Sequence, residues 1–307
     1  MLVFRGFSRS APRATALSIG NFDGVHLGHR ALLERLRAAA KSEGLLPAVL
    51  TFEPHPREFF APGTAPARLS TLREKLERLA EEGVALACVQ RFHAGFAALT
   101  AREFIERVLA GALKTALLII GDDFRYGAGR TGDFAMLEEA GGRHGFRVER
   151  MGGVVVDGER VSSSAARAAL AAGEMERAAR LLGQPYALDG RVAHGDGLGR
   201  RLGFATANLR IKHDPPPLSG VFAVEVFGLP GGPRRGVANV GVRPSAHALP
   251  RPLLEVHLFD FCADLYGAHL SVRFMHRLRS EIHFSDLAAL QAQIARDAES
   301  ARHYFQH

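Results

Sequence analysis

Cysteine is scarce in this sequence, and long apolar runs are missing. The only two cysteines, Cys88 and Cys262, stand far apart in apolar stretches, which indicates reduced core residues and excludes a disulfide framework. No apolar run approaches the ~20 residues that a membrane span needs. The first residues also lack a long apolar core after a basic start, which is unlike a secretion signal. We therefore expect a cytoplasmic protein with no membrane partner.

Runs of a single charge are missing too. There is no lysine-rich arm and no run of five like charges, although the formal net charge is +7 and the isoelectric point is about 10.0. Such a charge permits anionic partners, including nucleotides, phosphorylated substrates and nucleic acid. Because the excess comes from scattered arginines, a solvated basic surface is the favoured interpretation, and we expect small-molecule partners and no nucleic acid.

The length and patterning indicate two domains. The chain has 307 residues, which suits two domains of ~100–200 residues each. Its 47% hydrophobic and 23% charged residues are ordinary for a globular protein. The patterning changes at Leu182-Gly183-Gln184-Pro185. We therefore predict one domain over residues 1–183 and a second over residues 184–307.

The first predicted domain alternates strands with helices. Apolar runs predict strands at 16–19, 48–52, 85–89, 116–120 and 146–151. Helical stretches follow or separate them, and two begin at capping boxes, Thr71 with Glu74 and Thr100 with Glu103. This alternation predicts an α/β domain with a doubly wound parallel sheet. Ligands in such folds bind beyond the carboxyl ends of the strands.

The second predicted domain follows a period of two residues. Alternating runs occur at Val192, 221–227, 237–240, 253–259 and 270–274, and glycine and proline clusters separate them. This pattern predicts an antiparallel β-barrel or small sheet. A terminal helix begins near Ser285 and is expected to pack on the barrel through Leu287, Leu290, Ile294 and Ala298.

The stretch from Leu17 to His29 joins a strand, a glycine-rich loop and a helix. The first N–H groups of a helix are unpaired and lie at the positive end of its dipole, so an anion can bind there. His26 and His29 stand at this junction with Gly28 between them. The loop resembles the His-x-Gly-His signature of the adenylyl-transferring and aminoacyl-tRNA synthetase superfamily. A His-x-x-His pair is also compatible with half of a metal site or with two surface histidines.

Two further stretches supply polar residues for the same site. Gly121-Asp122-Asp123-Phe124-Arg125-Tyr126-Gly127 directly follows a predicted strand, at the edge where ligands bind. The run from Arg160 to Arg167 places serine hydroxyls and two arginines around a helix start. These serines suit phosphate binding beside arginine, but they equally suit a simple N-cap.

The second domain has one dense motif and one strand of interest. Glycines are concentrated between His194 and Asn208, where their N–H groups suit phosphate binding, although spacing alone also fits a series of β-turns. In the strand around 254–258, Glu255 and His257 share one face. Glu255 is therefore either a general base on the ligand side or an exposed glutamate.

Taken in order, these motifs resemble the bifunctional bacterial riboflavin kinase/FMN adenylyltransferase family, over about residues 17–297. A class I aminoacyl-tRNA synthetase would also need a Lys-Met-Ser-Lys-Ser-like loop, which is absent from the sequence. The resemblance implies that His26 and His29 contact the ATP triphosphate and stabilise the transition state of FAD formation. It implies nucleotide and phosphate binding in this first domain by Gly20, Phe22, Asp23, Gly28, Asp123, Arg160, Ser163 and Arg167.

The same resemblance assigns a riboflavin kinase site to the second domain. Nucleotide binding is expected at Gly195, Gly197, Gly199, Thr206 and Asn208. Thr206 and Asn208 would also bind Mg²⁺, Glu255 would be the general base for riboflavin, and Arg279 would contact the flavin. The chain departs from the family pattern at Ala205, where proline is usual, and at Ser245, where threonine is common. Loss of the proline is expected to loosen the backbone at Thr206.

The sequence leaves two alternatives open. One is an FMN adenylyltransferase whose kinase domain is impaired by changes such as Ala205. The other is a flavin- or RNA-binding regulator that uses the basic surface. ATP, riboflavin and FMN are the expected small-molecule partners and Mg²⁺ the expected cofactor, while the oligomeric state is left open.

Overall fold

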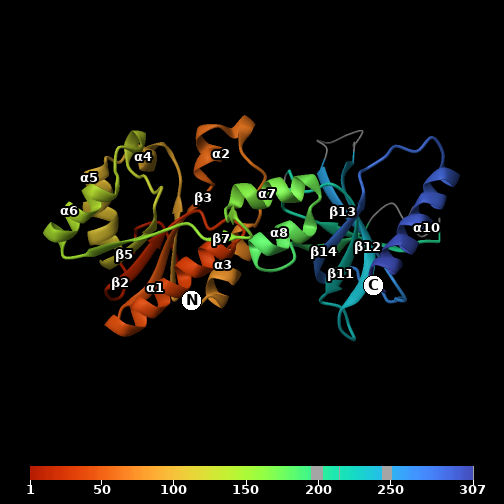
Figure 1. Ribbon diagram of the computed structural model, residues 1–307, viewed down its shortest axis with the longest axis horizontal. Helices are drawn as coiled ribbons and strands as arrows, with labels where there is room; N and C mark the ends of the chain where they lie inside the picture. The colour runs from red at the N-terminus through yellow and green to blue at the C-terminus, as the bar shows by residue number, and fades with distance from the viewer. Residues whose placement is uncertain (195–202, 214, 244–250, 307) are drawn as a thin grey trace. The chain divides into compact units, whose positions relative to one another are not determined.

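The computed structural model describes residues 1–194, 203–213, 215–243 and 251–306 (Figure 1). The chain forms two compact units. Unit 1 comprises Met1–Pro66 and Ser70–Val161, and unit 2 comprises Ala67–Leu69 and Ser162–His307. The boundary at residue 183 that we predicted between two activities stays a prediction. Among the helices that the structure describes, none is both long and apolar enough to cross a membrane.

Unit 1 is built on a six-stranded, entirely parallel sheet with the order β1-β4-β3-β2-β5-β6. The α/β fold class is confirmed, and five of the strands match the predicted runs. Strand β1 was not predicted from the sequence, because its apolar run is too short to indicate a strand without its pairing partner β4. The strands are β1 (Leu2–Arg5), β2 (Thr15–Ile19), β3 (Leu46–Glu53), β4 (Leu86–Arg91), β5 (Thr115–Gly121) and β6 (Arg147–Met151).

Helices cover both faces of this sheet. On one face α1 (Leu27–Glu43) and α3 (Leu72–Glu81) bury Leu33, Leu36 and Leu79 against it. On the other face α5 (Ala101–Glu103), the π-helical segment η2 (Phe104–Ala112) and α6 (Phe134–His144) complete the core. The shorter elements of the unit are α2 (Pro56–Phe60), η1 (Pro62–Thr64), α4 (Ala94–Ala97), η3 (Ala128–Arg130) and the β7–β8 hairpin (Val155–Val156, Glu159–Arg160).

The helix starts follow the capping chemistry expected from the sequence. Both predicted capping boxes form, at Thr71 with Glu74 and at Thr100 with Glu103. In each, the threonine hydroxyl accepts a hydrogen bond from the glutamate N–H, and the carboxylate accepts one from the threonine N–H. Side-chain capping of this kind contributes roughly 1 kcal/mol to a helix.

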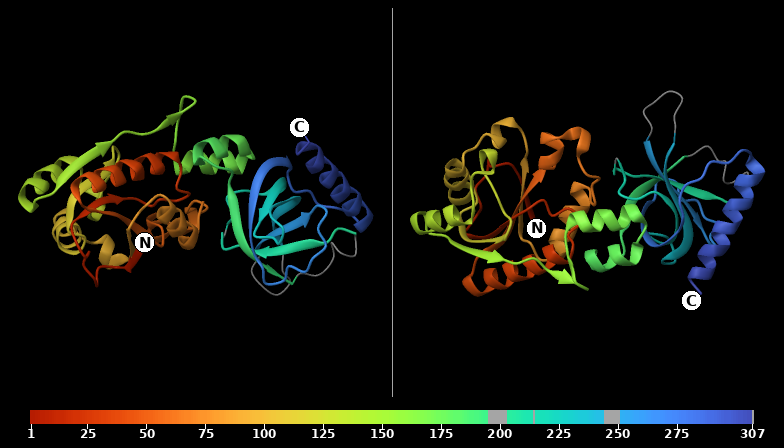
Figure 2. Two further views of the ribbon diagram at one scale, coloured as in Figure 1. Left: turned by 90° about the horizontal axis from the view of Figure 1, so that it is seen from below. Right: turned by 45° about the horizontal axis from the view of Figure 1, so that its top comes forward.

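Unit 2 contains a closed six-stranded barrel with the order β10-β13-β12-β11-β14-β9, which confirms the predicted barrel (Figure 2). Helices α7 (Ser163–Ala172) and α8 (Met175–Leu182) precede it, and α10 (Leu287–Tyr304) follows it. The strands are β9 (Ala187–Ala193), β10 (Thr206–Arg210), β11 (Gly220–Phe227), β12 (Arg234–Arg243), β13 (Arg251–Leu258) and β14 (His269–Arg279).

Helix α10 packs on the outer face of the barrel. Ala298 and Ala301 form one apolar cluster with Val221, Ala223 and Val237, which point outward from β11 and β12. The predicted packing therefore holds in the second half of the helix. It fails at Leu287, which is 58% exposed, because the buried stripe begins only at Asp297.

The two cysteines are free, as predicted, but they differ in environment. Cys88 is buried in β4, where burial raises the pKa of its thiol to about 12. Cys262 is exposed, so the expectation of a core position was wrong for it. It lies in the irregular segment after β13, where the apolar run has already ended.

Candidate active sites

The strand order of unit 1 reverses direction at β2. From β2 the chain proceeds to β3 and then β4 on one side, and it returns to β5 on the other. The loops after β2 and β5 therefore diverge at the carboxyl edge of the sheet, the place where α/β folds bind ligands. The histidine loop follows β2, and Asp122 with Asp123 follows β5.

The histidine loop is held in an unusual backbone conformation. Phe22 and Val25 are buried and have φ of 48° and 41°, a left-handed region that costs energy for residues with a Cβ. Asp23 accepts hydrogen bonds from Ser70 N at 3.0 Å and from Ser70 Oγ at 3.2 Å. Asp23 is thus a buried side chain that holds the loop in place through Ser70, and its predicted role in phosphate binding stays a prediction.

His26 and His29 come together as predicted. His26 is the N-cap of α1 and is only 7% exposed, and its Nδ1 accepts a hydrogen bond from His29 N at 3.3 Å. The two rings stack with centroids 3.7 Å apart and planes 16° apart. A Cβ on Gly28 would lie 3.2 Å from the His26 ring, so glycine gives the stack its room. Gly20 likewise lies against the Phe22 ring.

His29 is kept neutral at physiological pH. Burial lowers its pKa well below the ordinary 6.5, and the nearby His26 and Lys75 lower it further. Its Nδ1 is buried, and so is Asn21 Oδ1, and neither has a hydrogen-bond partner among the residues described. Unpaired buried polar atoms cost roughly 1–3 kcal/mol each, and these two atoms lie near the glycine-rich loop where the sequence predicts phosphate binding.

Lys75 is a feature of this site that we did not predict. It lies on α3, is 5% exposed, and acts electrostatically on His29. A sequence signal existed, because Lys75 stands one helical turn before the buried Leu79 and so falls on the core face of the helix. A cation on a core face is rarely left there without a partner or a function.

Asp123 and Arg160 also meet in unit 1. Arg160 Nη2 lies 3.0 Å from Asp122 Oδ1 and 3.7 Å from Asp123 Oδ2, and all three side chains are exposed. The next residue, Val161, has its carbonyl oxygen 3.7 Å from the position of a Cβ on Gly28. The segment carrying Arg160 therefore lies beside the histidine loop. Asp122, which was not among the predicted site residues, lies with Asp123 and Arg160.

Ser163 and Arg167 belong by their contacts to unit 2. Ser162, rather than Ser163, is the N-cap of α7, with its hydroxyl accepting a hydrogen bond from Ala165 N at 3.1 Å. Arg167 Nε donates to the carbonyl of Ala67 at 2.7 Å. A nucleotide-binding role for Ser163 and Arg167 stays a prediction.

The predicted kinase residues gather on the outer face of the barrel. Asn208 on β10 lies directly opposite Glu255 on β13, which in turn lies opposite Asn239 on β12. Opposed residues of antiparallel strands share a face, so these three half-buried side chains form one row. Thr206 pairs with His257 two residues away, on the same face. The place of His257 on the face of Glu255 was predicted from alternation along the strand, whereas that of Asn239 was not, because cross-strand register is invisible in the sequence.

The oxygen donors of this row fit a hard cation. Thr206 offers a hydroxyl, Asn208 an amide carbonyl and Glu255 a carboxylate, which are ligand types that Mg²⁺ prefers. Within the described ranges, no group of three or more His, Cys, Asp or Glu residues could hold a metal ion by itself. Gly195, Gly197 and Gly199 lie outside the described residues.

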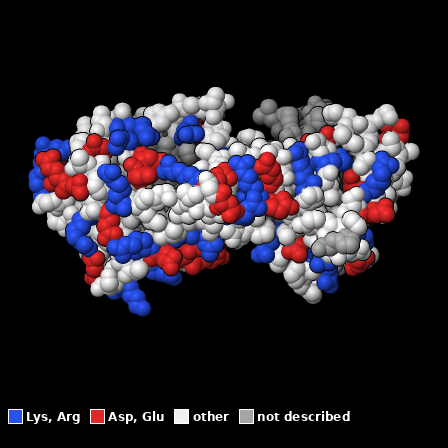
Figure 3. Space-filling model, viewed as in Figure 1, with Lys and Arg blue, Asp and Glu red and all other residues white. Residues whose placement is uncertain are grey.

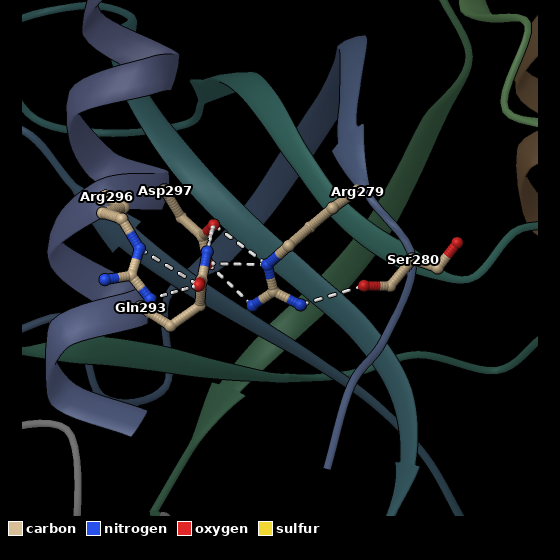
Figure 4. Close-up of polar contacts among 5 residues, drawn as sticks. All are labelled: Arg279, Ser280, Gln293, Arg296 and Asp297. Carbon is tan, nitrogen blue, oxygen red and sulfur yellow. Dashed lines mark hydrogen bonds and ion pairs between the residues drawn. The ribbon is translucent and has the colours of Figure 1, made fainter. Parts of the chain in front are cut away.

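Arg279 lies in the same cross-strand row but points toward α10. Asn239 pairs with Val221 on β11, and Val221 pairs with Arg279 on β14. The guanidinium of Arg279 is engaged by Asp297, with Nη2 2.7 Å from Asp297 Oδ2 (Figure 4). The predicted contact of Arg279 with flavin stays a prediction.

Known proteins match both units in the order observed. The sequence model of FAD synthetase matches residues 8–165, and that of riboflavin kinase matches residues 182–305. The bifunctional riboflavin kinase/FMN adenylyltransferase of Escherichia coli K12 is 48% identical, over 99% of this chain and 98% of that protein. The enzymes of the same name from Haemophilus influenzae and Pseudomonas fluorescens are 47% and 45% identical, each over at least 94% of both chains.

A solved structure shares the fold along the whole chain. It is the crystal structure of a protein from Streptococcus pneumoniae described as a macrolide-efflux protein, 27% identical, with a TM-score of 0.82. It covers 98% of this chain and 99% of its own. A parallel α/β unit that matches FAD synthetase, joined to a closed barrel that matches riboflavin kinase, thus defines a two-module enzyme. The chain belongs to the bifunctional riboflavin kinase/FMN adenylyltransferase family.

Proposed function

We propose that this chain makes FAD from riboflavin in two ATP-dependent steps. The first step phosphorylates riboflavin to FMN, and the second transfers AMP from ATP to FMN with release of pyrophosphate. The observation that carries this proposal is the presence of both family matches in one chain, each over a unit with its own polar site. We assign FMN adenylylation to residues 1–183 and riboflavin phosphorylation to residues 184–307.

In the adenylyltransferase site the chain provides charge stabilisation rather than a nucleophile. An oxygen of the FMN phosphate attacks the α-phosphorus of ATP, and the bond to pyrophosphate breaks. The start of α1 offers unpaired N–H groups to the phosphates. Because His26 Nδ1 accepts a hydrogen bond, neutral His26 carries its proton on Nε2. We propose that this Nε2–H donates a hydrogen bond to the ATP phosphates. These preorganised donors stabilise charge that develops in the transition state.

The remaining predicted residues of this site shape the loop or bind phosphate. Gly20 and Gly28 leave room for Phe22 and for the histidine stack, and Asp23 fixes the loop through Ser70. We place Arg160 with Asp123 at the edge of the site, where a guanidinium suits phosphate oxygens. Ser163 and Arg167 are proposed to contribute further phosphate contacts.

In the kinase site Glu255 acts as the general base. It takes the proton of the terminal ribityl hydroxyl of riboflavin as that oxygen attacks the γ-phosphorus of ATP, and ADP leaves. Thr206 and Asn208 would supply oxygen ligands for Mg²⁺, which when bound would neutralise charge on the phosphate oxygens. The glycines expected to bind the phosphates, Gly195, Gly197 and Gly199, lie outside the described residues.

The contact of His257 with Ala205 argues against an impaired kinase. His257 Nδ1–H donates to the carbonyl oxygen of Ala205 at 2.9 Å, and the Phe204 ring packs edge-on against His257. These contacts fix the backbone just before Thr206, where the family usually has proline. We therefore propose that the substitution leaves both activities in place.

The surface favours small-molecule partners over nucleic acid. On the face drawn in Figure 3, basic and acidic side chains are interspersed. Ion pairs of arginine with glutamate or aspartate recur along the chain, such as Arg35 with Glu149 and Arg147 with Glu43. Mixed charge of this kind is unlike a basic nucleic-acid-binding face. From the family we propose ATP, riboflavin and FMN as the partners and the cytoplasm as the compartment.

Two single-site variants test the proposal. With riboflavin, ATP and Mg²⁺, the wild-type protein should release both FMN and FAD, as followed by chromatography of the flavins. His29→Ala should still form FMN but no FAD, and Glu255→Gln should form FAD only from added FMN. His144→Ala, at the exposed end of α6, is the histidine control and should behave as wild type. Loss of both activities in a folded His29→Ala protein would contradict separate sites.

A further inference from the structure

The contact between Arg279 and Asp297 is the most enclosed ion pair for which both partners lie in unit 2 among those described. The two side chains are 21% and 8% exposed. Arg279 Nε donates to Asp297 Oδ1 at 2.9 Å and Oδ2 at 3.1 Å, and Gln293 Nε2 donates to Oδ1 at 2.8 Å (Figure 4). The orientation of the Arg279 guanidinium is thus fixed by Asp297, which Gln293 of the same helix α10 holds in turn.

Arg279 also holds the chain that follows β14. Its Nη1 donates to the carbonyl of Ser280 at 2.9 Å. From the other side, Arg277 Nη2 donates to Ser280 Oγ at 3.1 Å, while Arg277 Nη1 donates to the carbonyl of Ala172. Ser280 is therefore fixed through both its backbone and its side chain by two guanidinium groups.

The residue after Ser280 lies against the face that carries the kinase row. The carboxylate of Glu281 lies over Gly241 on β12, so closely that a Cβ on Gly241 would overlap it. Gly241 is two residues from Asn239 and on the same face, a separation of roughly 7 Å along a strand. Glu281 therefore borders the row of Asn208, Glu255 and Asn239.

We infer that Asp297 is a positioning residue of the kinase site, acting through Arg279 and Ser280 to hold Glu281 beside that row. The inference rests on the proposed placement of the kinase site on this face. Without the aspartate, the guanidinium loses three of its four hydrogen bonds and no longer orients the Ser280 carbonyl. Glu281 then moves away from its position next to Asn239 and no longer borders the row of kinase residues.

A second ion pair of α10 provides a control that distinguishes positioning of Glu281 from attachment of α10 to the barrel. Arg302, in the last turn of α10, bonds Asp260 after β13 at 3.2 Å through both of its Nη atoms. This pair also fastens α10 to the barrel, but it has no contact with the Ser280–Glu281 segment among the hydrogen bonds described. Arg302→Gln is therefore the matched control for Asp297→Asn.

The test measures riboflavin phosphorylation in the full-length protein. Asp297→Asn should lower kcat/KM about tenfold, less than the roughly hundredfold loss that a 1 Å misplacement can cause, while FMN adenylylation is unchanged. Arg302→Gln should keep kcat/KM within about twofold of wild type. Glu281→Gln should lower kcat/KM as well, and the double variant Asp297→Asn with Glu281→Gln should be no worse than the poorer single variant, because both changes act on one group.

A second substitution keeps the inference testable if Asp297→Asn does not fold. Arg279→Lys retains the charge opposite Asp297 but cannot bond Asp297 and Ser280 together, so it should fold and show the same loss. Near-wild-type kcat/KM in folded Arg279→Lys or Asp297→Asn, or losses that multiply with Glu281→Gln, would overturn the inference. If Glu255→Gln also left phosphorylation intact, the proposed kinase site itself would be wrong.

Discussion

His29 shows how much of the chemistry of unit 1 depends on one side chain. Its neutral ring stacks on His26, packs near Phe22 and lies within the field of Lys75. A neutral imidazole can donate one hydrogen bond to phosphate without the cost of burying a second charge next to a buried lysine. We therefore expect the proposed site to rely on the helix start and on N–H donors rather than on an imidazolium.

The lowered pKa of His29 makes the stability of unit 1 depend on pH. The pKa of His29 is lower in the folded state than its ordinary value of 6.5, which applies to the unfolded chain. Between these two pKa values the unfolded chain therefore binds more protons than the folded chain. The contribution of this group is therefore complete above pH 6.5 and is lost as the pH falls below it, with a slope of at most about 1.4 kcal/mol per pH unit.

Urea unfolding of the wild type and of His29→Gln between pH 7.5 and 5.5 measures this effect. The chain has no tryptophan, so circular dichroism is the suitable signal. The wild type should lose more stability than the variant on acidification, and the difference between them cancels the other histidines. Equal pH dependence of the two proteins would show that burial of His29 carries no such cost.

Single residues also mark the limits of prediction from sequence. The histidine pair, Thr206, Asn208 and Glu255 could be proposed as site residues because they stand in short motifs that resemble those of the family, and their roles stay predictions. Lys75 was missed although its spacing from Leu79 puts it on the core face of α3, whereas the place of Asn239 in the row arises from strand register, which the sequence does not show. The fastening of Asp23 by Ser70, 47 residues away, depends on tertiary contacts that no local pattern encodes.

At the level of elements, the strands and capped helices were predictable and their pairing was not. Local alternation and capping boxes located β11 and α3 closely. The parallel pairing of β1 with β4 depends on a partner 84 residues away, which local patterning does not reveal. Likewise, the row that joins Asn208 to Glu255 appears only when β10 closes the barrel against β13.

The junction of β11 and β14 allows a prediction at this scale. Gly220 begins β11 with φ of 119°, and a Cβ there would lie 2.6 Å from the carbonyl oxygen of Arg279. Gly220→Ala should destabilise unit 2 by about 2–4 kcal/mol, from backbone strain together with overpacking. Gly232→Ala is the matched control, because φ is 95° but nothing lies within 4 Å, so only strain of about 1 kcal/mol is expected.

Thermal unfolding followed by circular dichroism, with riboflavin phosphorylation measured alongside, distinguishes the two glycine variants. Gly220→Ala should unfold at a lower temperature than Gly232→Ala and should lose kinase activity, since Arg279 and Ser280 must shift to admit the methyl group. Equal unfolding temperatures would mean that β14 yields without cost at this position.

At the scale of the whole molecule, the two sites share a product that can diffuse. If FMN made at the proposed kinase site is released before it reaches the proposed adenylyltransferase site, neither reaction needs the other site on the same polypeptide. A mixture of His29→Ala and Glu255→Gln should therefore form FAD from riboflavin, although neither variant does so alone. The rate should rise with FMN concentration, and a mixture that makes FMN but no FAD would show that the intermediate must pass within one chain.

The three-residue segment Ala67–Leu69 belongs by its contacts to unit 2, although it interrupts the sequence of unit 1. Tyr186 donates from its hydroxyl to the carbonyl of Leu69, and Arg167 donates to that of Ala67. A protein fragment starting at residue 184 would thus lose the acceptor for Tyr186, and it would also lack Ala172 and Glu176, which bind Arg277 and His276. A fragment of the chain that begins at Ser162 keeps Ala172 and Glu176 as partners for β14 but still lacks the Ala67 and Leu69 carbonyls, so it should be more stable than one that begins at residue 184 and less stable than unit 2 in the full chain.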